Sequence, residues 1–285
     1  MSNPRAFLCW SVGLFVLTGP PALAAEAVPL TAVAHIHGIA FDTSNAGTVL
    51  LATHHGIFRV GSDGMATRIS PDENDYMGFT ALPGAPGTFI ASGHPEGGGN
   101  LGVLATETSG AGWRALSMGA DGPVDFHAMS ASPADPMRLY GLYGGIQTSL
   151  DGGKTWTHVS STPADVFDLA AYPDNDTHLF AATRNGLFET LDAGVNWTGL
   201  GPTGIPVTLV EATLDGTLYA FYAGQGLFGR DASGRWSVLN ASFGNDVLLH
   251  LAADPRDAKH LLAVTQNSEV RESIDGGANW QPYAR

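Results

Sequence analysis

Three copies of one octapeptide decide the fold of this chain: Ser149-Leu150-Asp151-Gly152-Gly153-Lys154-Thr155-Trp156, Thr190-Leu191-Asp192-Ala193-Gly194-Val195-Asn196-Trp197 and Ser273-Ile274-Asp275-Gly276-Gly277-Ala278-Asn279-Trp280. In each copy the aspartate is placed to accept backbone N–H groups of a tight turn. A glycine supplies the positive φ that a Cβ disfavours, and the tryptophan packs the turn against its neighbours. The repetition predicts an architecture built from equivalent β-hairpins.

Weaker copies extend the repeat through the rest of the chain. Residues 106–113 and 229–236 keep the spacing and the tryptophan, and residues 62–64 form a similar turn without it. The aspartate positions, or their equivalents, then follow one another at intervals of 39 to 45 residues. Short strands repeated with this period are typical of a β-propeller. We therefore predict an all-β fold, a single β-propeller of six four-stranded blades; seven blades would each have to be very short.

The blade template can be read from two segments of the sequence. Strands are expected at residues 37–42, 48–53, 56–60 and 66–69, and the same order returns at 166–170, 177–182 and 186–190. No long segment with a helical period of 3.6 competes with this reading. The last strand is expected near residues 281–283, and residues 28–33 are expected to add an outer strand that closes the ring.

Residues 1–25 have the features of a secretory signal. Arg5 gives a positive start, residues 6–17 are apolar, and Ala22-Leu23-Ala24 forms a cleavage site of small residues. A retained signal anchor is the alternative. Residues 26–285 are then one propeller domain, periplasmic or secreted, with no membrane insertion after cleavage. The only cysteine, Cys9, leaves with the signal, so neither a disulfide nor a thiolate nucleophile is expected.

The charge balance restricts the partners of this protein. The chain has a formal charge of −14, and loss of Arg5 leaves 12 basic against 27 acidic residues. Such a surface repels nucleic acid and anionic lipid. We expect a metal ion or a protein of the cell envelope as the partner, a monomeric state and no organic cofactor.

The histidines are unevenly distributed and fall at repeated places in the template. Six of the ten precede residue 128: His35, His37, His54, His55, His94 and His127. They lie where first strands begin or second strands end, and antiparallel pairing brings both places to the same edge of a blade. Because the first strand of a propeller blade is innermost, these side chains are expected at one mouth of the central channel.

Imidazole, carboxylate and thioether groups at such a mouth are the ligand types of a transition-metal site. The predicted metal ligands are His35, His37, His55, Met77, His94 and His127, with copper or zinc as the ion. His54 and His55 point in opposite directions in a regular strand, so only one is expected to contribute, and His55 is favoured. The alternative is a set of histidines that form ordinary hydrogen bonds. His158, His178 and His260 lie elsewhere and are given no role.

The octapeptides resemble the Asp-box of the BNR-repeat superfamily, which includes sialidases, xyloglucanases, the sortilin ectodomain and a photosystem II assembly factor. The segments His35–Gly38, Thr53–Gly56, Asp75–Phe79, Ser92–Pro95 and Asp125–Ala128 are together similar to exported bacterial Asp-box propellers labelled glycosyl hydrolase or sialidase-like. The resemblance implies a propeller over essentially all of the mature chain, and it raises the possibility of hydrolase activity.

The sialidase label is only weakly supported by the residues. Phe58-Arg59-Val60 is the nearest match to the Phe-Arg-Ile-Pro segment of sialidases, and it lacks the proline. A glycoside hydrolase also needs two carboxylates about 5–10 Å apart, for which the candidates are Asp75, Asp125 and Asp168, joined by Glu96 or Glu211. The favoured prediction is therefore a non-catalytic protein that binds a metal, in metal handling or metalloprotein assembly. A glycoside hydrolase and a protein-interaction scaffold are the alternatives.

Overall fold

The computed structural model describes residues 26–284, and the proposed signal sequence lies outside them. Their strands form six antiparallel sheets, each built from consecutive strands. The first three blades are β2 (Ile36–Phe41), β3 (Val49–Thr53), β4 (Gly56–Val60), β5 (Met65–Arg68); β6 (Asp75–Ala81), β7 (Phe89–His94), β8 (Val103–Thr106), β9 (Arg114–Ser117); and β10 (Met129–Ala131), β11 (Leu139–Leu142), β12 (Ile146–Ser149), β13 (Thr157–His158). The other three are β14 (Val166–Ala171), β15 (Leu179–Thr183), β16 (Gly186–Thr190), β17 (Thr198–Leu200); β18 (Val207–Ala212), β19 (Leu218–Tyr222), β20 (Gly226–Arg230), β21 (Trp236–Asn240); and β22 (Leu248–Asp254), β23 (Asp257–Thr265), β24 (Val270–Ser273), β25 (Gln281–Pro282).

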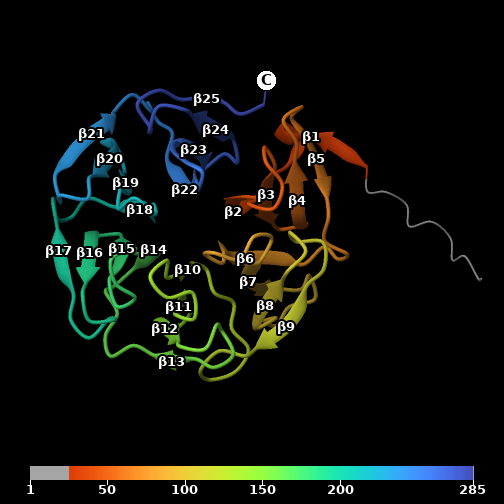
Figure 1. The fold of residues 1–285 in the computed structure, drawn as a ribbon, viewed down its shortest axis with the longest axis horizontal. Helices are drawn as coiled ribbons and strands as arrows, with labels where there is room; N and C mark the ends of the chain where they lie inside the picture. The colour runs from red at the N-terminus through yellow and green to blue at the C-terminus, as the bar shows by residue number, and fades with distance from the viewer. Residues whose placement is uncertain (1–25, 285) are drawn as a thin grey trace, which may run out of the picture.

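The six sheets stand around a common centre like the blades of a propeller (Figure 1). The first strand of each blade is innermost and contacts the first strands of both neighbouring blades. The predicted fold, a single propeller with six four-stranded blades, is therefore confirmed. In the described part of the chain no helix is long and apolar enough to cross a membrane; the helix that is present, η1 (Leu30–Ala32), has three residues.

The ring closes by side-chain packing between the first and last blades. The short strand β1 (Ala27–Pro29) pairs antiparallel with β5, so the first blade gains a fifth, outer strand (Figure 1). The last blade is completed by its own strand β25. An outer strand was expected here, but it joins the first blade alone. Ile39 and Leu51 pack with Leu262 and Val264 in one cluster that joins the two blades.

The hydrophobic core is divided among the interfaces between blades. Each of six clusters of buried side chains draws its members from two adjacent blades. In five of the six blades the second strand is almost wholly buried, as in Val49–Thr53, Leu179–Thr183 and Leu218–Tyr222, and in the sixth blade the second half of β23 is buried. The second strand has sheet neighbours on both sides and another blade packed on each face, which explains its continuous run of apolar residues.

The octapeptide turns are held by their own side chains. In the first copy, Asp151 Oδ1 accepts the backbone N–H groups of Lys154 and Thr155 at 3.0 and 2.9 Å. The Thr155 hydroxyl donates to Asp151 Oδ2 at 2.7 Å. Asp192 and Asp275 make the matching bonds to Asn196 and Asn279. The hydrogen bonds to Asp151, chiefly the one from the Thr155 hydroxyl, lower the pKa of Asp151 to about 2. The turns are scaffold elements, as the sequence indicated.

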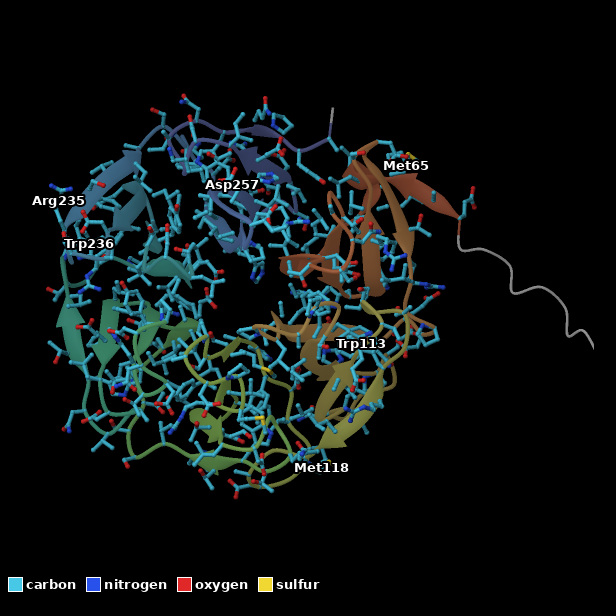
Figure 2. The ribbon with its side chains drawn as sticks, in the orientation of Figure 1. Met65, Trp113, Met118, Arg235, Trp236 and Asp257 are labelled. Atoms are coloured by element: carbon cyan, nitrogen blue, oxygen red, sulfur yellow. The ribbon has the colours of Figure 1, made fainter. Side chains whose placement is uncertain are left out.

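The tryptophan of the first octapeptide joins two blades. Trp156 is buried, its indole N–H donates to Gly153 O at 3.1 Å and to Ser117 Oγ at 3.2 Å, and its ring packs on Phe126. By contrast, Trp236 lies at the outer edge of the fifth blade (Figure 2).

We expect Trp156→Phe to lower the free energy of unfolding by about 1–2 kcal/mol, because Gly153 O and Ser117 lose a buried donor. Urea unfolding measures the change. Trp236→Phe is the control and should cost less than about 0.5 kcal/mol. An equal loss in the two variants would contradict the bridging role of Trp156.

Candidate metal centre at the channel mouth

The backbone turns at the far end of the inner strands align the first three blades. The amides of Asp42, Leu82 and Ser132 donate to the carbonyls of Thr48, Thr88 and Arg138 in the same way. The residues five positions before these three amides are therefore equivalent in the three blades, and they are His37, Met77 and His127. The residues seven positions before them are a second equivalent set, which consists of His35, Asp75 and Asp125. The fold thus repeats a pair of potential ligand positions at the start of three adjacent inner strands.

A β-bulge sets the direction of His37. Ile36 pairs with Thr53 and Gly38 with Ala52, so His37 is the extra residue of β2. The fourth, fifth and sixth blades have the same irregularity at Phe167, Thr208 and Leu249. A bulge leaves one residue outside the regular ladder and re-aims its side chain. His37, Phe167 and Leu249 accordingly line the central cavity, and His127, which precedes β10, also lines it.

Asp75 is the most deeply buried acidic group at this mouth. Its exposed fraction is 4%, and neither carboxylate oxygen has a hydrogen bond of acceptable geometry within the described residues. The next residue fixes its strand, because Tyr76 is fully buried and donates its hydroxyl to Asp72 at 3.0 Å. A buried carboxylate without hydrogen bonds is unfavourable by several kcal/mol unless a cation or proton joins it.

Three imidazoles surround this carboxylate. His37 Nε2 lies 3.6 Å from Asp75 Oδ1, His94 Nε2 lies 3.3 Å from Asp75 Oδ2, and His54 Nδ1 is in close contact with Oδ2. Single ligand atoms of His37, His54 and Asp75 all lie within 4.8 Å of one another. The buried Nε2 of His37 also has no hydrogen-bond partner among residues 26–284. We call His37, His54, Asp75 and His94 the mouth cluster.

The donor set of the mouth cluster fits a small divalent transition metal. A tetrahedral ion with N and O ligands at 2.0–2.1 Å holds these atoms about 3.3–3.5 Å apart. The separations from Asp75 to His37 and His94 are close to that range. Burial lowers the pKa of His37, and this outweighs the opposing effect of Asp75. A lowered pKa keeps the imidazole neutral, which is the state that binds metal.

The other predicted ligands differ in position. His35 is exposed, has a positive φ of 54° and packs its ring edge-on against His54, with centroids 4.9 Å apart. His55 is also exposed, so the structure places His54, rather than the favoured His55, against Asp75. Met77 is half-buried and, like His54, Asp75 and His94, is not among the described residues that line the cavity.

A second His–Asp pair lies beside the mouth cluster. His127 Nε2 is 3.5 Å from Asp125 Oδ2, and the other oxygen, Asp125 Oδ1, is buried without a partner in the described chain. A hydrogen bond from His127 to Asp125 is the main cause that raises the pKa of His127, and the charge of Asp75 adds to it. His127 therefore lies within the field of both carboxylates. We call Asp125 and His127 the Asp125 pair.

The cavity continues down the centre of the ring with a volume of about 820 Å³. Its wall contains many alanines and leucines, together with Asp168, Glu211 and His250. Burial raises the pKa of Asp168 to about 7 and that of Glu211 to about 8, and Asp168 adds to the shift of Glu211. Burial lowers the pKa of His250 to about 4. All three groups favour their neutral forms, in keeping with an apolar channel.

Three other histidines, His158, His178 and His260, pair with carboxylates away from the mouth cluster. His178 faces Asp174 at 2.8 Å and Glu189 at 3.0 Å, and His260 faces Glu272 at 2.9 Å. His158 forms a largely exposed pair with Asp121 at 2.8 Å. These contacts give each histidine a structural partner, and the surface pair His158–Asp121 provides a control for the buried ones.

The six sheets define this protein as a six-bladed β-propeller, and its fold is similar to that of several solved structures. The chain is similar to the GH74 xyloglucanase from Xanthomonas campestris, at 19% identity and a TM-score of 0.62, over 90% of this chain and 46% of that one. It is also similar to YCF48 bound to D1 peptide, at 19% identity and a TM-score of 0.57, over 90% and 84% of the two chains. A third similar structure is the extracellular domain of a putative hybrid two-component system from B. thetaiotaomicron, at 16% identity and a TM-score of 0.58, over 91% and 34%.

These likenesses establish the fold alone. The chain spans about half the length of the xyloglucanase chain, 46% of it. No protein-family model matches the sequence, and no curated protein matches it.

Proposed function

We propose that this protein is an exported propeller that binds a transition-metal ion, zinc or copper, at the mouth cluster. The observation that carries the proposal is the carboxylate of Asp75, 4% exposed and without hydrogen bonds in the described chain, among three imidazoles. A bound divalent ion would satisfy both carboxylate oxygens and the free Nε2 of His37. Imidazole and carboxylate donors without a thioether favour zinc or Cu(II) over Cu(I).

The biological role that we propose is metal handling or metalloprotein assembly in the cell envelope. The secretory features of residues 1–25 and the resemblance to exported Asp-box propellers support this location. The mouth cluster also fits the role, because His54 and His94 are half-buried and leave the site open toward solvent. Such access lets an ion enter the site from the solvent.

Metal content tests the proposal directly. Mature protein purified without a His-tag, incubated with zinc or copper and desalted, should retain close to one ion per chain by inductively coupled plasma mass spectrometry. His54→Ala and Asp75→Asn should lose most of that ion, since removal of one ligand typically weakens binding more than the 10–100-fold of an outer-shell change.

The matched control is His55→Ala. His55 is the sequence neighbour of His54, is exposed and is no member of the mouth cluster, so its loss should leave the metal content unchanged. Circular dichroism establishes that each variant is folded. Metal-free wild-type protein, or equal retention in His54→Ala and His55→Ala, would overturn the proposal.

A glycoside hydrolase is the alternative, and the GH74 neighbour together with the channel carboxyls motivates a test. A hydrolase needs one protonated and one ionised carboxyl. Here both oxygens of Asp168 accept backbone N–H groups, from Leu169 at 2.9 Å and from Val210 at 3.0 Å, so the scaffold holds this carboxylate. We expect no turnover on a panel of chromogenic glycosides, and release of product that Glu211→Gln abolishes would reverse the order of the two proposals.

A further inference from the structure

Asp125, which precedes the inner strand of the third blade, is a buried carboxylate like Asp75 on the second blade. The two residues occupy the same template position, and Asp125 is 7% exposed with its Oδ1 buried and unpaired within residues 26–284. It forms an ion pair with an imidazole, His127, whose Nε2 lies 3.5 Å from Oδ2. One oxygen of this buried carboxylate therefore lacks a partner in the described chain, and the other faces a potential metal ligand.

Blade two fixes the Asp125 pair next to the mouth cluster. Ser92 on β7 is fully buried, donates its hydroxyl to Val124 O at 3.1 Å and accepts the Phe126 N–H at 2.9 Å. These two bonds clamp the backbone on both sides of Asp125. Ser92 lies two residues before His94, whose pairing partner in the sheet is Asp75.

The inner strand of blade two approaches the same segment. A Cβ placed on Gly78 would lie 2.5 Å from Phe126 O, so the backbones of β6 and of the segment leading to His127 are in direct contact. The Asp125 pair is thus attached to the strands that carry Asp75 and His94. The two carboxylates belong to one rigid wall of the channel mouth.

We propose that the Asp125 pair is a second transition-metal position, so that the mouth holds two ions. This inference rests on the proposed function of the mouth cluster. Asp125 and His127 would supply one oxygen and one nitrogen, and water would complete the coordination. The side chain of His127 is 62% exposed, so this ion would exchange readily, whereas the ion at the buried Asp75 would be held. Such a pair suits a protein that receives an ion at an exposed position and retains it at a deeper one.

Equilibrium titration with Co(II), followed by d–d absorption and isothermal calorimetry, distinguishes one ion from two. The wild-type protein should bind two equivalents, with the second removed by desalting. Asp125→Asn and His127→Gln should each weaken the second equivalent at least about tenfold and leave the first unchanged. His54→Ala should weaken the first. The control Asp121→Asn disrupts the exposed His158–Asp121 pair and should change neither.

The possible outcomes separate this inference from the proposed function. If the wild-type protein and Asp125→Asn both bind one equivalent of Co(II), the second position is overturned and the mouth cluster is unaffected. The same conclusion follows if both proteins bind two equivalents. No binding by the wild-type protein would overturn both proposals. If Asp125→Asn does not fold, the exposed His127→Gln decides, and loss of the second equivalent in that variant supports the second position.

Discussion

Gly93→Ala should destabilise the protein by about 3–5 kcal/mol, because it adds a clash with the backbone to an unfavourable φ. Gly93 has a φ of 140°, a region that residues with a Cβ rarely adopt, and an added Cβ would lie 1.9 Å from the carbonyl oxygen of Asp75. Gly93 pairs with Tyr76 in the sheet. The substitution therefore forces apart the two strands that carry Asp75 and His94.

The same substitution should also lower metal retention in the molecules that remain folded, since Asp75 cannot keep its place. Urea unfolding followed by tryptophan fluorescence gives the stability, and metal analysis at low temperature gives the occupancy. Gly97→Ala is the control: Gly97 lies in the following turn, and an added Cβ would have no atom within 4 Å. Its stability should change by less than about 0.5 kcal/mol. Similar effects at the two positions would show that the close approach of Gly93 to Asp75 is unimportant.

The sequence predicted the propeller because its periodicity is a local property. The spacing of Asp151, Asp192 and Asp275 follows from the number of residues that four short strands and their turns require. Turn chemistry at these positions depends on neighbours within four residues. The number of blades and the strand order therefore followed from the pattern without knowledge of distant contacts.

The choice between His54 and His55 could not be made by the rule of alternating faces. Strand β3 ends at Thr53 and β4 begins at Gly56, so the two histidines form the turn and belong to neither strand. The Thr53 hydroxyl accepts the His55 N–H at 3.0 Å and donates to Gly56 O at 2.9 Å. These bonds fix the turn and leave His54 on the side of Asp75. Alternation describes extended strands, and it does not hold across a hairpin turn.

The central place of Asp75 was also hidden from the sequence. Asp75 was recognised there as a possible hydrolase carboxylate, and Met77 as the ligand from the same strand. Which of them meets the histidines depends on the bulge at His37 and on the packing of β6 against β2. Register shifts of this kind are set by contacts between strands, and single-sequence patterns do not contain them.

Glu211 makes the stability of the folded protein depend on pH. Its pKa rises from 4.5 to about 8 on folding, chiefly through burial, with Asp168 as the second cause. A carboxyl group whose pKa is raised in the folded state favours folding fully below its unfolded pKa. This contribution is lost as the pH rises through the folded pKa. The folded protein should therefore lose stability between pH 5 and pH 9 through this group.

Other titrating groups do not produce a difference in pH-dependent stability between the wild-type protein and a Glu211 variant. The octapeptide aspartates have pKa values lowered to about 2, so they are ionised throughout this interval. The pKa of His250, lowered to about 4, makes the folded state lose stability as the pH falls from about 6.5 toward 4. That loss is common to the wild-type protein and a Glu211 variant. The difference between their unfolding free energies isolates Glu211 and its coupling to Asp168.

Glu211→Gln should consequently be close to neutral at pH 5 and more stable than the wild-type protein at pH 9. The full shift would correspond to more than 4 kcal/mol at about 1.4 kcal/mol per pKa unit, and water in the channel reduces this to about 2–3 kcal/mol. Urea unfolding at pH 5, 7 and 9 in the presence of a chelator measures it. Glu96→Gln removes the same charge from an exposed turn and should stay within about 0.5 kcal/mol of the wild-type protein at every pH. Parallel pH profiles for Glu211→Gln and the wild-type protein would show that Glu211 ionises in the folded channel as it does in water, and the channel would then be well hydrated.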